Sequence, residues 1–408
     1  MTVCRFCAAP LLHEFVDFGQ TPLANSYLPP TPEACEGERT FPLRVMVCDS
    51  CWLVQTTETI PADEIFTHDY AYLSSYSSEW VAHAQSYAQT MTERFGLDAS
   101  SRVVEVASND GYLLQWFARS DIPVLGVEPA GHAAEIAESR GVATRVAFFG
   151  EQTARELREE GLVADLMVAN NVLAHVPDLR DFVAGFVVLL KPSGVATFEF
   201  PHLANLIRFG QFDTIYHEHY SYLLLLFVEQ LMQTAGLEVF DVETLPTHGG
   251  SLRVFVGHPS MHPIKSGLAK VRMDEAGMEL DTINPYAAFG ERVEQICTNL
   301  RAFVDKVIDE GKTVAAYGAP AKGNTFLNVA GIGTDRIAFT VDRNPEKQGM
   351  LLPGSHIPVY APSHIPEEKP DYLLILPWNL ADEIASQQAA IRGWGGKFVT
   401  VIPDFRVF

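Results

Sequence analysis

The sequence Ser101-Arg-Val-Val-Glu-Val-Ala-Ser-Asn-Asp-Gly111 decides the fold of the central part of the chain. Its apolar half predicts a buried strand, and residues 108–111 are a tight turn into a helix expected over residues 112–119. A second strand is expected over residues 124–128, and its last residue is an acid. A strand, a turn, a helix and a second strand in this order are typical of a parallel sheet covered by helices.

The same alternation continues to about residue 210, with further strands expected near residues 142–146, 164–171 and 195–201. We therefore predict a doubly wound α/β domain over residues 66–245. Ligands of such sheets bind at the carboxyl ends of the strands. The residues at those ends are the candidate cofactor ligands: Glu105, Ala107, Asn109, Asp110, Gly111, Glu128, Pro129, Phe148, Phe149, Asn170, Asn171 and His175.

The sequence of the turn over residues 105–111 discriminates between two classes of cofactor. A dinucleotide site needs Gly-x-Gly-x-x-Gly, whose bare N–H groups hold a pyrophosphate. The turn here is acidic and poorer in glycine, which suits the cationic S-adenosylmethionine, and Glu128 is placed to accept its ribose hydroxyls. A methyltransferase is therefore favoured over an NAD dehydrogenase. Phe148 and Phe149 either pack in the core or flank the adenine, and His175 either faces the cofactor or is structural.

Four of the six cysteines stand in two matched pairs, Cys4-Arg-Phe-Cys7 and Cys48-Asp-Ser-Cys51. Two such pairs supply four thiolates for a closed tetrahedral Zn²⁺ site, so the metal is expected to be structural. A redox role is less favoured, because a redox Cys-x-x-Cys needs only one pair. Residues 1–65 are thus predicted to form a small zinc-binding lobe, with a turn-rich excursion that includes residues 19–30 between the pairs.

The formal net charge is −22, from 29 basic and 51 acidic residues. This excess of acid argues against nucleic acid as a partner, since binding a phosphate polymer needs clustered Lys and Arg. No apolar run approaches the roughly 18 residues of a membrane span, so a cytoplasmic protein without a membrane partner is expected.

A second unusual stretch follows the fifth strand and reads Gln211-Phe-Asp-Thr-Ile-Tyr-His-Glu-His-Tyr-Ser-Tyr222. Two histidines flank a glutamate, which concentrates proton-transfer groups near the strand ends. A metal site is disfavoured because His217 and His219 lie two positions apart, so on a helix they would not face one centre. A polar surface turn is the other alternative.

A second α/β array is expected over residues 246–408, and two of its loops carry candidate substrate ligands. The first is Thr247-His-Gly-Gly-Ser-Leu-Arg253, and the second is Gly318-Ala-Pro-Ala-Lys-Gly-Asn324. The second lacks the Lys-Ser/Thr of a P-loop, but its helix N-terminus and Lys322 can seat a diphosphate. A strand–helix turn without a ligand is the alternative. The substrate candidates are His248, Gly249, Arg253, Gly318, Lys322 and Asn324.

Together these motifs resemble those of the sugar-nucleotide C-methyltransferases of deoxysugar biosynthesis, and the likeness covers essentially the whole chain. It rests on the four cysteines, the turn over residues 105–111, the segment 213–219 and the loops 248–253 and 317–323. The resemblance implies a zinc lobe, a central S-adenosylmethionine domain and a C-terminal Rossmann-like domain that helps to hold the sugar nucleotide. It also implies methylation at C-3′ of a nucleotide-linked 4-keto-deoxysugar, with dTDP as the expected nucleotide.

Carried onto this chain, the resemblance makes His219 the general base, with Tyr216 and Glu218 lining the sugar site. A further family tyrosine corresponds to Tyr70 or Tyr72, and Tyr70 is preferred. A carbon beside a ketone can lose a proton because the charge spreads onto the oxygen, and a histidine with an ordinary pKa of about 6.5 suits that step at neutral pH. The alternatives are O- or N-methyl transfer to the same class of sugar, and a non-catalytic zinc-containing binding protein.

Overall fold

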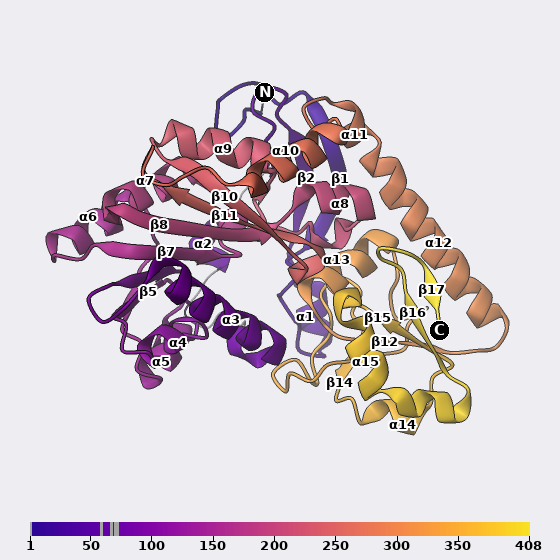
Figure 1. Ribbon diagram of the computed structural model, residues 1–408. Helices are drawn as coiled ribbons and strands as arrows, with labels where there is room; N and C mark the ends of the chain where they lie inside the picture. The colour runs from indigo at the N-terminus through magenta and orange to yellow at the C-terminus, as the bar shows by residue number, and fades with distance from the viewer. Residues whose placement is uncertain (1, 58–59, 66–67, 69–72) are drawn as a thin grey trace.

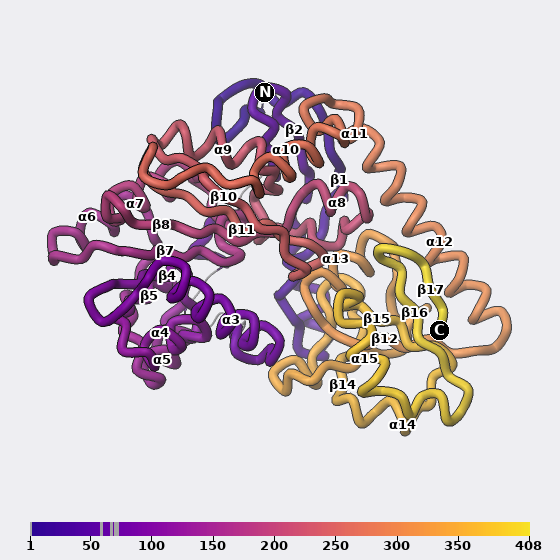
Figure 2. Tube along the Cα trace, in the orientation of Figure 1, coloured from indigo at the N-terminus to yellow at the C-terminus, as the bar shows by residue number. Residues whose placement is uncertain are grey.

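In the computed structural model, which describes residues 2–57, 60–65, 68 and 73–408, the chain folds around three β-sheets. Figure 1 shows the central sheet and the C-terminal sheet on opposite sides of the molecule, with the N-terminal strands β1 (His13–Pro22) and β2 (Thr40–Val47) between them. The Cα trace in Figure 2 follows the N-terminal lobe, drawn in indigo, down between the other two parts. The predicted three-part α/β architecture is confirmed.

The sheet of the N-terminal lobe is antiparallel, in the order β1-β2-β3-β9, with β3 at Val54–Thr56 and β9 at Ser221–Tyr222. The lobe also contains the short helices α1 (Pro32–Glu36) and α2 (Ala62–Ile65). Strand β9 is the end of the histidine-rich segment, and it pairs with β3. One strand of the lobe's sheet therefore comes from the segment that carries the predicted base.

The central sheet has seven strands and reverses its order at β4. Across the sheet the strands are β10 (Glu238–Leu245), β11 (Ser251–Gly257), β8 (Leu190–Pro201), β7 (Ala164–Asn170), β4 (Val103–Val106), β5 (Val124–Glu128) and β6 (Thr144–Val146). Strands β8 to β6 are parallel, whereas β11 is antiparallel to both of its neighbours. The neighbours of β4 lie on opposite sides of it, and this reversal is where α/β sheets bind ligands.

Helices cover both faces of the central sheet because its strands bury apolar side chains on both sides. Along β4, Val103 joins one apolar core and Val104 joins the other. The face of Val103 is covered by α3 (Ser78–Phe95), α4 (Leu114–Ala118) and α5 (Gly131–Ser139). The opposite face is covered by α6 (Glu151–Glu159), α7 (Leu179–Leu189), α9 (Leu225–Thr234) and α10 (Ser266–Gly277).

The central sheet extends past residue 245, where the sequence predicted the third domain to begin. Strand β11 pairs with both β10 and β8, so residues 251–257 belong to this sheet. The turn between β10 and β11 contains Pro246, Gly249 and Gly250. Proline and glycine are as common in hairpin turns as in linkers between domains, so composition does not separate the two.

The C-terminal sheet has the order β14-β13-β12-β15-β16-β17 and is parallel up to β16. Its strands are β12 (Val314–Tyr317), β13 (Thr340–Val341), β14 (Val359–Tyr360), β15 (Tyr372–Ile375), β16 (Lys397–Thr400) and β17 (Arg406–Val407). Its helices are α13 (Ala321–Ala330), α14 (His364–Glu368) and α15 (Ala381–Gln387). This second parallel array was predicted from the sequence.

The long helix α12 (Phe289–Asp309) joins the C-terminal part to the N-terminal lobe, and α11 (Asn284–Ala287) precedes it. Its buried residues recur every three or four positions, which gives one apolar face. That face and helix α8 (Leu203–Phe209) share one apolar core with the strands β1 and β2. The N-terminal lobe thus packs as part of the body of the protein.

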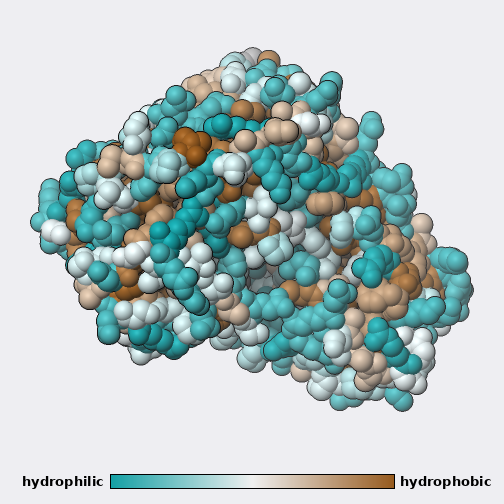
Figure 3. Space-filling view, viewed as in Figure 1, coloured by the Kyte–Doolittle hydropathy of each residue, from teal (hydrophilic) through white to brown (hydrophobic). Residues whose placement is uncertain are grey.

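The surface view in Figure 3 shows hydrophilic and hydrophobic residues intermixed, with a hollow between the central and C-terminal parts. Among the described residues, no helix is both long enough and apolar enough to cross a membrane.

Candidate active site

Three acidic side chains lie buried at the carboxyl ends of β4 and β5: Glu105, Asp110 and Glu128. The two oxygens of Glu128 accept hydrogen bonds of 2.8 Å each, from the N–H groups of Asn109 and Ala130, and so fix the turn after β4. Burial raises the pKa of Glu128 and raises that of Glu105 well above its usual value. A cationic ligand beside them would offset the cost of keeping these carboxylates charged.

The same strand ends hold polar atoms that lack partners. Within the described part of the chain, Glu105 Oε2, Asp110 Oδ1, Asn171 Oδ1 and both amide atoms of Asn170 are buried without a hydrogen bond. Buried polar atoms are normally paired, so such a group of unpaired atoms at a sheet's ligand-binding edge indicates a ligand-binding site. Their acceptor-rich, acidic character fits S-adenosylmethionine, whose amino group and sulfonium are cationic.

Backbone geometry marks this edge as well. Ala107, Asn109 and Asn171 have φ angles of 52°, 49° and 56°, in the left-handed region that costs energy for residues with a side chain, and Gly111 has a φ of 75°. Such strained residues cluster at ligand sites, where the surrounding structure holds them in place.

The two adjacent phenylalanines after β6 have different surroundings. The ring of Phe149 packs against Phe182 and Phe186 at centroid distances of 5.8 and 5.3 Å, so it belongs to the core. Phe148 is 47% exposed and is therefore the one available to flank a ligand. Pro129, at the end of β5, is partly exposed.

The two histidines of the 211–222 segment point in different directions. His217 Nε2 lies 3.3 Å from the carbonyl oxygen of Phe41 in the N-terminal lobe. His219 instead packs against Tyr216 and His175, with ring centroids 4.1 and 4.6 Å apart. Among the described residues, the cysteine quartet is the one group of three or more potential metal ligands that lie close together.

His219 has the tautomer that a base requires. Its Nδ1 donates to the carbonyl oxygen of Thr214 over 2.7 Å, and a carbonyl can only accept, so the proton of the neutral ring is assigned to Nδ1. The lone pair therefore lies on Nε2. Burial lowers the pKa of His219 well below 6.5, and the nearby His175 lowers it further, so the ring is neutral at pH 7.

Other predicted residues surround this base. Nδ1 of His175 donates to the carbonyl oxygen of Glu218 over 2.8 Å. This bond fixes His175 between the carboxyl end of β7 and the 211–222 segment. The carboxylate of Glu218 is buried and accepts a hydrogen bond of 2.6 Å from Asn25 Nδ2. Tyr70 and Tyr72 lie outside the described residues.

The C-terminal part meets this cluster through Trp378, whose indole N–H donates to Asp213 Oδ2 over 2.7 Å. Burial raises the pKa of Asp213 to about 6. Lys322 Nζ lies 5.1 Å from the Trp378 ring centroid and donates to Asn379 Oδ1 over 2.8 Å. A Cβ on Gly249 would come within 2.4 Å of the Trp378 ring, so only glycine permits this contact.

Two other residues of the predicted diphosphate loop have internal partners. The N–H of Gly318 donates to the carbonyl oxygen of Val341 over 2.7 Å. The side-chain amide of Asn324 donates to the carbonyl oxygen of Ala24 over 2.6 Å. In this loop Lys322 retains the features expected of a phosphate ligand, whereas Asn324 holds the N-terminal lobe.

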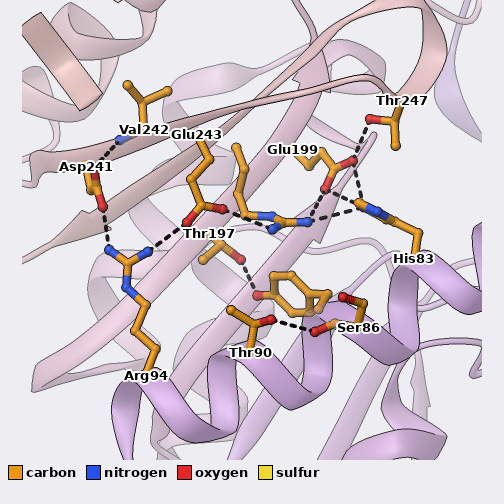
Figure 4. A network of polar contacts seen from close by, with 12 residues as sticks. His83, Ser86, Thr90, Arg94, Thr197, Glu199, Asp241, Val242, Glu243 and Thr247 are labelled. Carbon is orange, nitrogen blue, oxygen red and sulfur yellow. Dashed lines mark hydrogen bonds and ion pairs between the residues drawn. The ribbon is translucent and has the colours of Figure 1, made fainter. Parts of the chain in front are cut away.

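Arg253 does not lie where a diphosphate ligand was expected. Its guanidinium forms a buried ion pair of 2.9 Å with Glu199 and a pair of 3.2 Å with the partly exposed Glu243, and it also contacts His83. These three partners are labelled in Figure 4. The register of β11 and β8 places Arg253 opposite Glu199. Because this carboxylate already neutralises the guanidinium in the interior, the pairing argues against a role for Arg253 in substrate binding.

His248 lies at the cofactor edge. Its Nε2 accepts a hydrogen bond of 3.0 Å from the amide of Asn171, its φ is 52°, and its ring centroid is 5.1 Å from that of Trp80. Burial lowers its pKa to about 4. The sequence predicts His248 to be a substrate ligand. In the structure it lies between Asn171, which follows β7, and Gly249, which contacts Trp378.

The four predicted zinc ligands Cys4, Cys7, Cys48 and Cys51 converge, with all sulfur atoms within 4.8 Å of one another. The sulfur atoms of Cys4 and Cys51 are 3.6 Å apart, and those of Cys7 and Cys48 are 3.4 Å apart. Tetrahedral zinc with bonds of about 2.3 Å needs sulfur atoms about 3.8 Å apart, so the quartet fits the metal. Gln55 donates to Cys4 Sγ over 3.1 Å and orients this ligand.

Sequence reasoning missed Arg5, Asn25, Gln55 and Trp378. Arg5 lies between two zinc ligands and Asn25 lies in the turn-rich stretch of residues 19–30, where cysteines and turn-forming residues carry the sequence signal. Their contacts depend on how three parts of the chain pack, which spacing does not reveal.

Comparison with known proteins agrees with this geometry. Three family models match the chain: "Putative zinc binding domain" over residues 4–66, "Methyltransferase domain" over residues 80–242 and "C-methyltransferase C-terminal domain" over residues 246–403. The fold and the site thus define a methyltransferase with a zinc-binding lobe.

The C-methyltransferase NovU of Streptomyces niveus is 37% identical over 405 residues, which are 99% of this chain and 96% of NovU. The chain belongs to the C-methyltransferase family. Its cofactor is S-adenosylmethionine, and its cysteine quartet binds zinc. An O-methyltransferase of ubiquinone biosynthesis from Rhizobium etli is 29% identical over 111 residues, which are 25% of this chain and 45% of that protein. Among solved structures, the magnesium protoporphyrin IX methyltransferase ChlM from Synechocystis PCC 6803 matches 44% of this chain and 83% of its own with 12% identity and a TM-score of 0.35.

Proposed function

We propose that this C-methyltransferase acts at C-3′ of an NDP-4-keto-deoxysugar, with dTDP as the nucleotide, and that His219 removes the proton beside the ketone. The observation that supports this most strongly is the hydrogen bond from His219 Nδ1 to the Thr214 carbonyl oxygen, which leaves Nε2 as the proton acceptor. The cytoplasmic location and the absence of a nucleic-acid partner are part of the proposal and rest on composition.

Proton removal requires a neutral base close to the carbon. The low pKa of His219 keeps its ring neutral at working pH, and a positioned base contributes about 10²–10⁴-fold to the rate. As Nε2 takes the proton, the electron pair of the C–H bond moves into the enolate and its charge spreads onto the ketone oxygen. When bound, S-adenosylmethionine supplies the electrophilic methyl group that the enolate carbon takes up.

The surrounding side chains have roles in binding and orientation. Tyr216 packs on the His219 ring and supplies a hydroxyl, which in a water-poor site can stabilise an enolate oxygen. Lys322 stands at the N-terminus of α13, where backbone N–H groups and a cation favour a diphosphate. Tyr70 is proposed to line the sugar site.

The base is tested by His219→Asn, because asparagine keeps an N–H for the Thr214 carbonyl and has no basic nitrogen to take the proton. Methyl transfer should fall at least about 100-fold, while calorimetric binding of S-adenosylmethionine stays unchanged. His217→Asn is the matched control, since His217 faces the N-terminal lobe. Near-normal turnover by His219→Asn would exclude His219 and turn attention to His217.

Transfer to oxygen or nitrogen of the same sugar is the second candidate, because a neutral histidine can also deprotonate a hydroxyl group. Carbon NMR of the product with a ¹³C-labelled methyl group separates the cases. A carbon-bound methyl supports the proposal, and an oxygen- or nitrogen-bound methyl overturns it. Binding of keto-sugar nucleotides without methyl transfer would support the non-catalytic alternative.

A further inference from the structure

The loop that follows β1 touches all three parts of the protein. Residues 23–27, here called the 23–27 loop, lie between β1 and α1 in the turn-rich excursion of the zinc lobe. Leu23 packs against the small apolar cluster of Ile60, Ile65 and Tyr220, and Tyr220 neighbours His219 in the chain.

The central contact of the loop reaches the catalytic segment. Nδ2 of Asn25 donates to Glu218 Oε1 over 2.6 Å, and Glu218 is only 5% exposed. A short hydrogen bond to a buried carboxylate is charge-assisted and strongly directional. The carbonyl of the same glutamate accepts from His175, so Glu218 connects Asn25 to the ring that packs on His219.

The loop is fixed at both ends by the C-terminal part. The carbonyl oxygen of Ala24 accepts the side-chain amide of Asn324, and the hydroxyl of Tyr27 donates to the carbonyl oxygen of Ala319. Beyond the loop, Leu28 and Leu351 pair through backbone hydrogen bonds of 3.1 and 2.7 Å. The backbone that carries Asn25 is therefore held in place on both sides by hydrogen bonds to the C-terminal part.

The zinc knuckle itself makes a second contact with the catalytic segment. Arg5 stands between two zinc ligands, and its guanidinium donates to the Tyr220 carbonyl and, over 3.2 Å, to Ser221 Oγ. It also donates to the Thr56 carbonyl oxygen over 2.7 Å, at the end of β3. The metal site and the strand pairing of β3 with β9 thus hold the residues directly after His219.

From these contacts we propose that Asn25 is a positioning residue for Glu218, and that through it the zinc lobe aligns the catalytic segment with the C-terminal part. Asn25 acts on the reaction through Glu218 and does not need to touch the substrate. The predicted effect of Asn25 on turnover rests on the proposed function, whereas its predicted effect on the order of the 211–222 segment does not.

The primary test compares Asn25→Ala with Ser26→Ala in the full-length, zinc-loaded protein. Ser26 is the exposed neighbour in the same loop and is the matched control. Hydrogen–deuterium exchange should accelerate in peptides covering residues 215–222 of Asn25→Ala, while peptides from the cysteine pairs and the zinc content stay as in wild type. Unchanged exchange over residues 215–222 would overturn the proposal, whatever the activity.

The kinetic test uses a double-mutant cycle with Glu218→Gln. Asn25→Ala should lower kcat roughly 10- to 100-fold, with little change in the affinity for S-adenosylmethionine, because a hydrogen bond to a charged group is lost. If Asn25 works through Glu218, the double variant should be no slower than the slower single variant. Losses that multiply would contradict the inference.

The same experiments separate failure of this inference from failure of the proposed function. Faster exchange over residues 215–222 in Asn25→Ala, together with full turnover by Glu218→Gln, would retain the structural coupling and remove the role proposed for Glu218. Turnover loss in Asn25→Ala without any change of exchange in the segment would remove the coupling and leave the role of His219 untouched.

Discussion

His219 Nδ1 and the carbonyl oxygen of Thr214 lie 2.7 Å apart, and this hydrogen bond defines which nitrogen of the ring can act as a base. Thr214 ends a short 3₁₀ turn, Phe212–Thr214, and the middle residue of that turn is Asp213. Asp213 is in turn hydrogen-bonded to Trp378 of the C-terminal part. The orientation of the base therefore depends on a contact between two parts of the protein.

Trp378→Phe should slow methyl transfer, because it removes the donor that holds the buried Asp213 and the turn that carries the Thr214 carbonyl. We expect kcat to fall roughly tenfold, in line with about 1.5–3 kcal/mol for a hydrogen bond to a charged group. The control is Trp394→Phe, which removes an indole hydrogen bond of 3.0 Å to Pro370 in the same domain. That control should lose about 1 kcal/mol of stability and keep its kcat, so equal losses of kcat in both variants would refute the link.

Lys322→Met should move the acidic limb of the pH profile of kcat/KM to higher pH. The positive charge of Lys322 contributes to the low pKa of His219, so its removal makes protonation of the ring easier and raises that pKa. The pKa of Asp213 moves in the same direction, since Lys322 also lowers it. Full pH profiles of wild type and variant provide the measurement. If the acidic limb stays at the same pH or moves to lower pH, Lys322 does not lower the pKa of His219.

The strand pattern of the sequence was sufficient to predict the parallel part of the central sheet, because its strands, β4 to β8, alternate with helices along the chain. Strands β9 and β11 were harder to assign to a sheet, since β9 pairs with the distant strand β3 and β11 joins the central sheet through its pairing with β8. The cysteine quartet was predictable because zinc requires a fixed ligand number. The contacts of Asn25, Trp378 and Arg5 were not, because they form only when the three parts pack together.

Residue type alone does not assign a role to Arg253, because a guanidinium suits a diphosphate as well as it suits a buried carboxylate. The register of β11 against β8 places Arg253 opposite Glu199, and that register is a property of the folded sheet. The choice between Phe148 and Phe149 likewise depended on burial. By contrast, the 211–222 segment could be predicted as a site because its unusual composition has few structural explanations.

Arg253→Met should destabilise the protein without affecting substrate binding. It leaves the fully buried Glu199 without its main cation, and breaking a buried pair costs about 3–5 kcal/mol. Arg94→Met is the control, since Arg94 is more exposed and pairs with Asp241 and Glu243 at the rim, where about 1 kcal/mol or less is expected. Denaturant unfolding and KM for the sugar nucleotide are measured together. A raised KM with unchanged stability would restore Arg253 as a ligand.

Asn170→Ala should weaken S-adenosylmethionine binding while leaving the ligand-free protein as stable as wild type. Both amide atoms of Asn170 are buried and lack partners among the described residues, so their removal costs the free protein no hydrogen bond. We expect the Kd for S-adenosylmethionine to rise roughly 10-fold or more, measured by calorimetry. Asn299→Ala, on the exposed face of α12, is the control. Unchanged affinity would place the cofactor away from the end of β7.

The most direct test of the central claim is hydrogen exchange at the carbon beside the ketone in D₂O, with enzyme and a 4-keto-deoxysugar nucleotide but without methyl donor. The account predicts that the wild-type enzyme and His217→Asn incorporate deuterium at C-3′, and that His219→Asn does not, because Nε2 of His219 removes that proton. Exchange by His219→Asn at the wild-type rate, or an absence of enzyme-dependent exchange in the wild type, would contradict it.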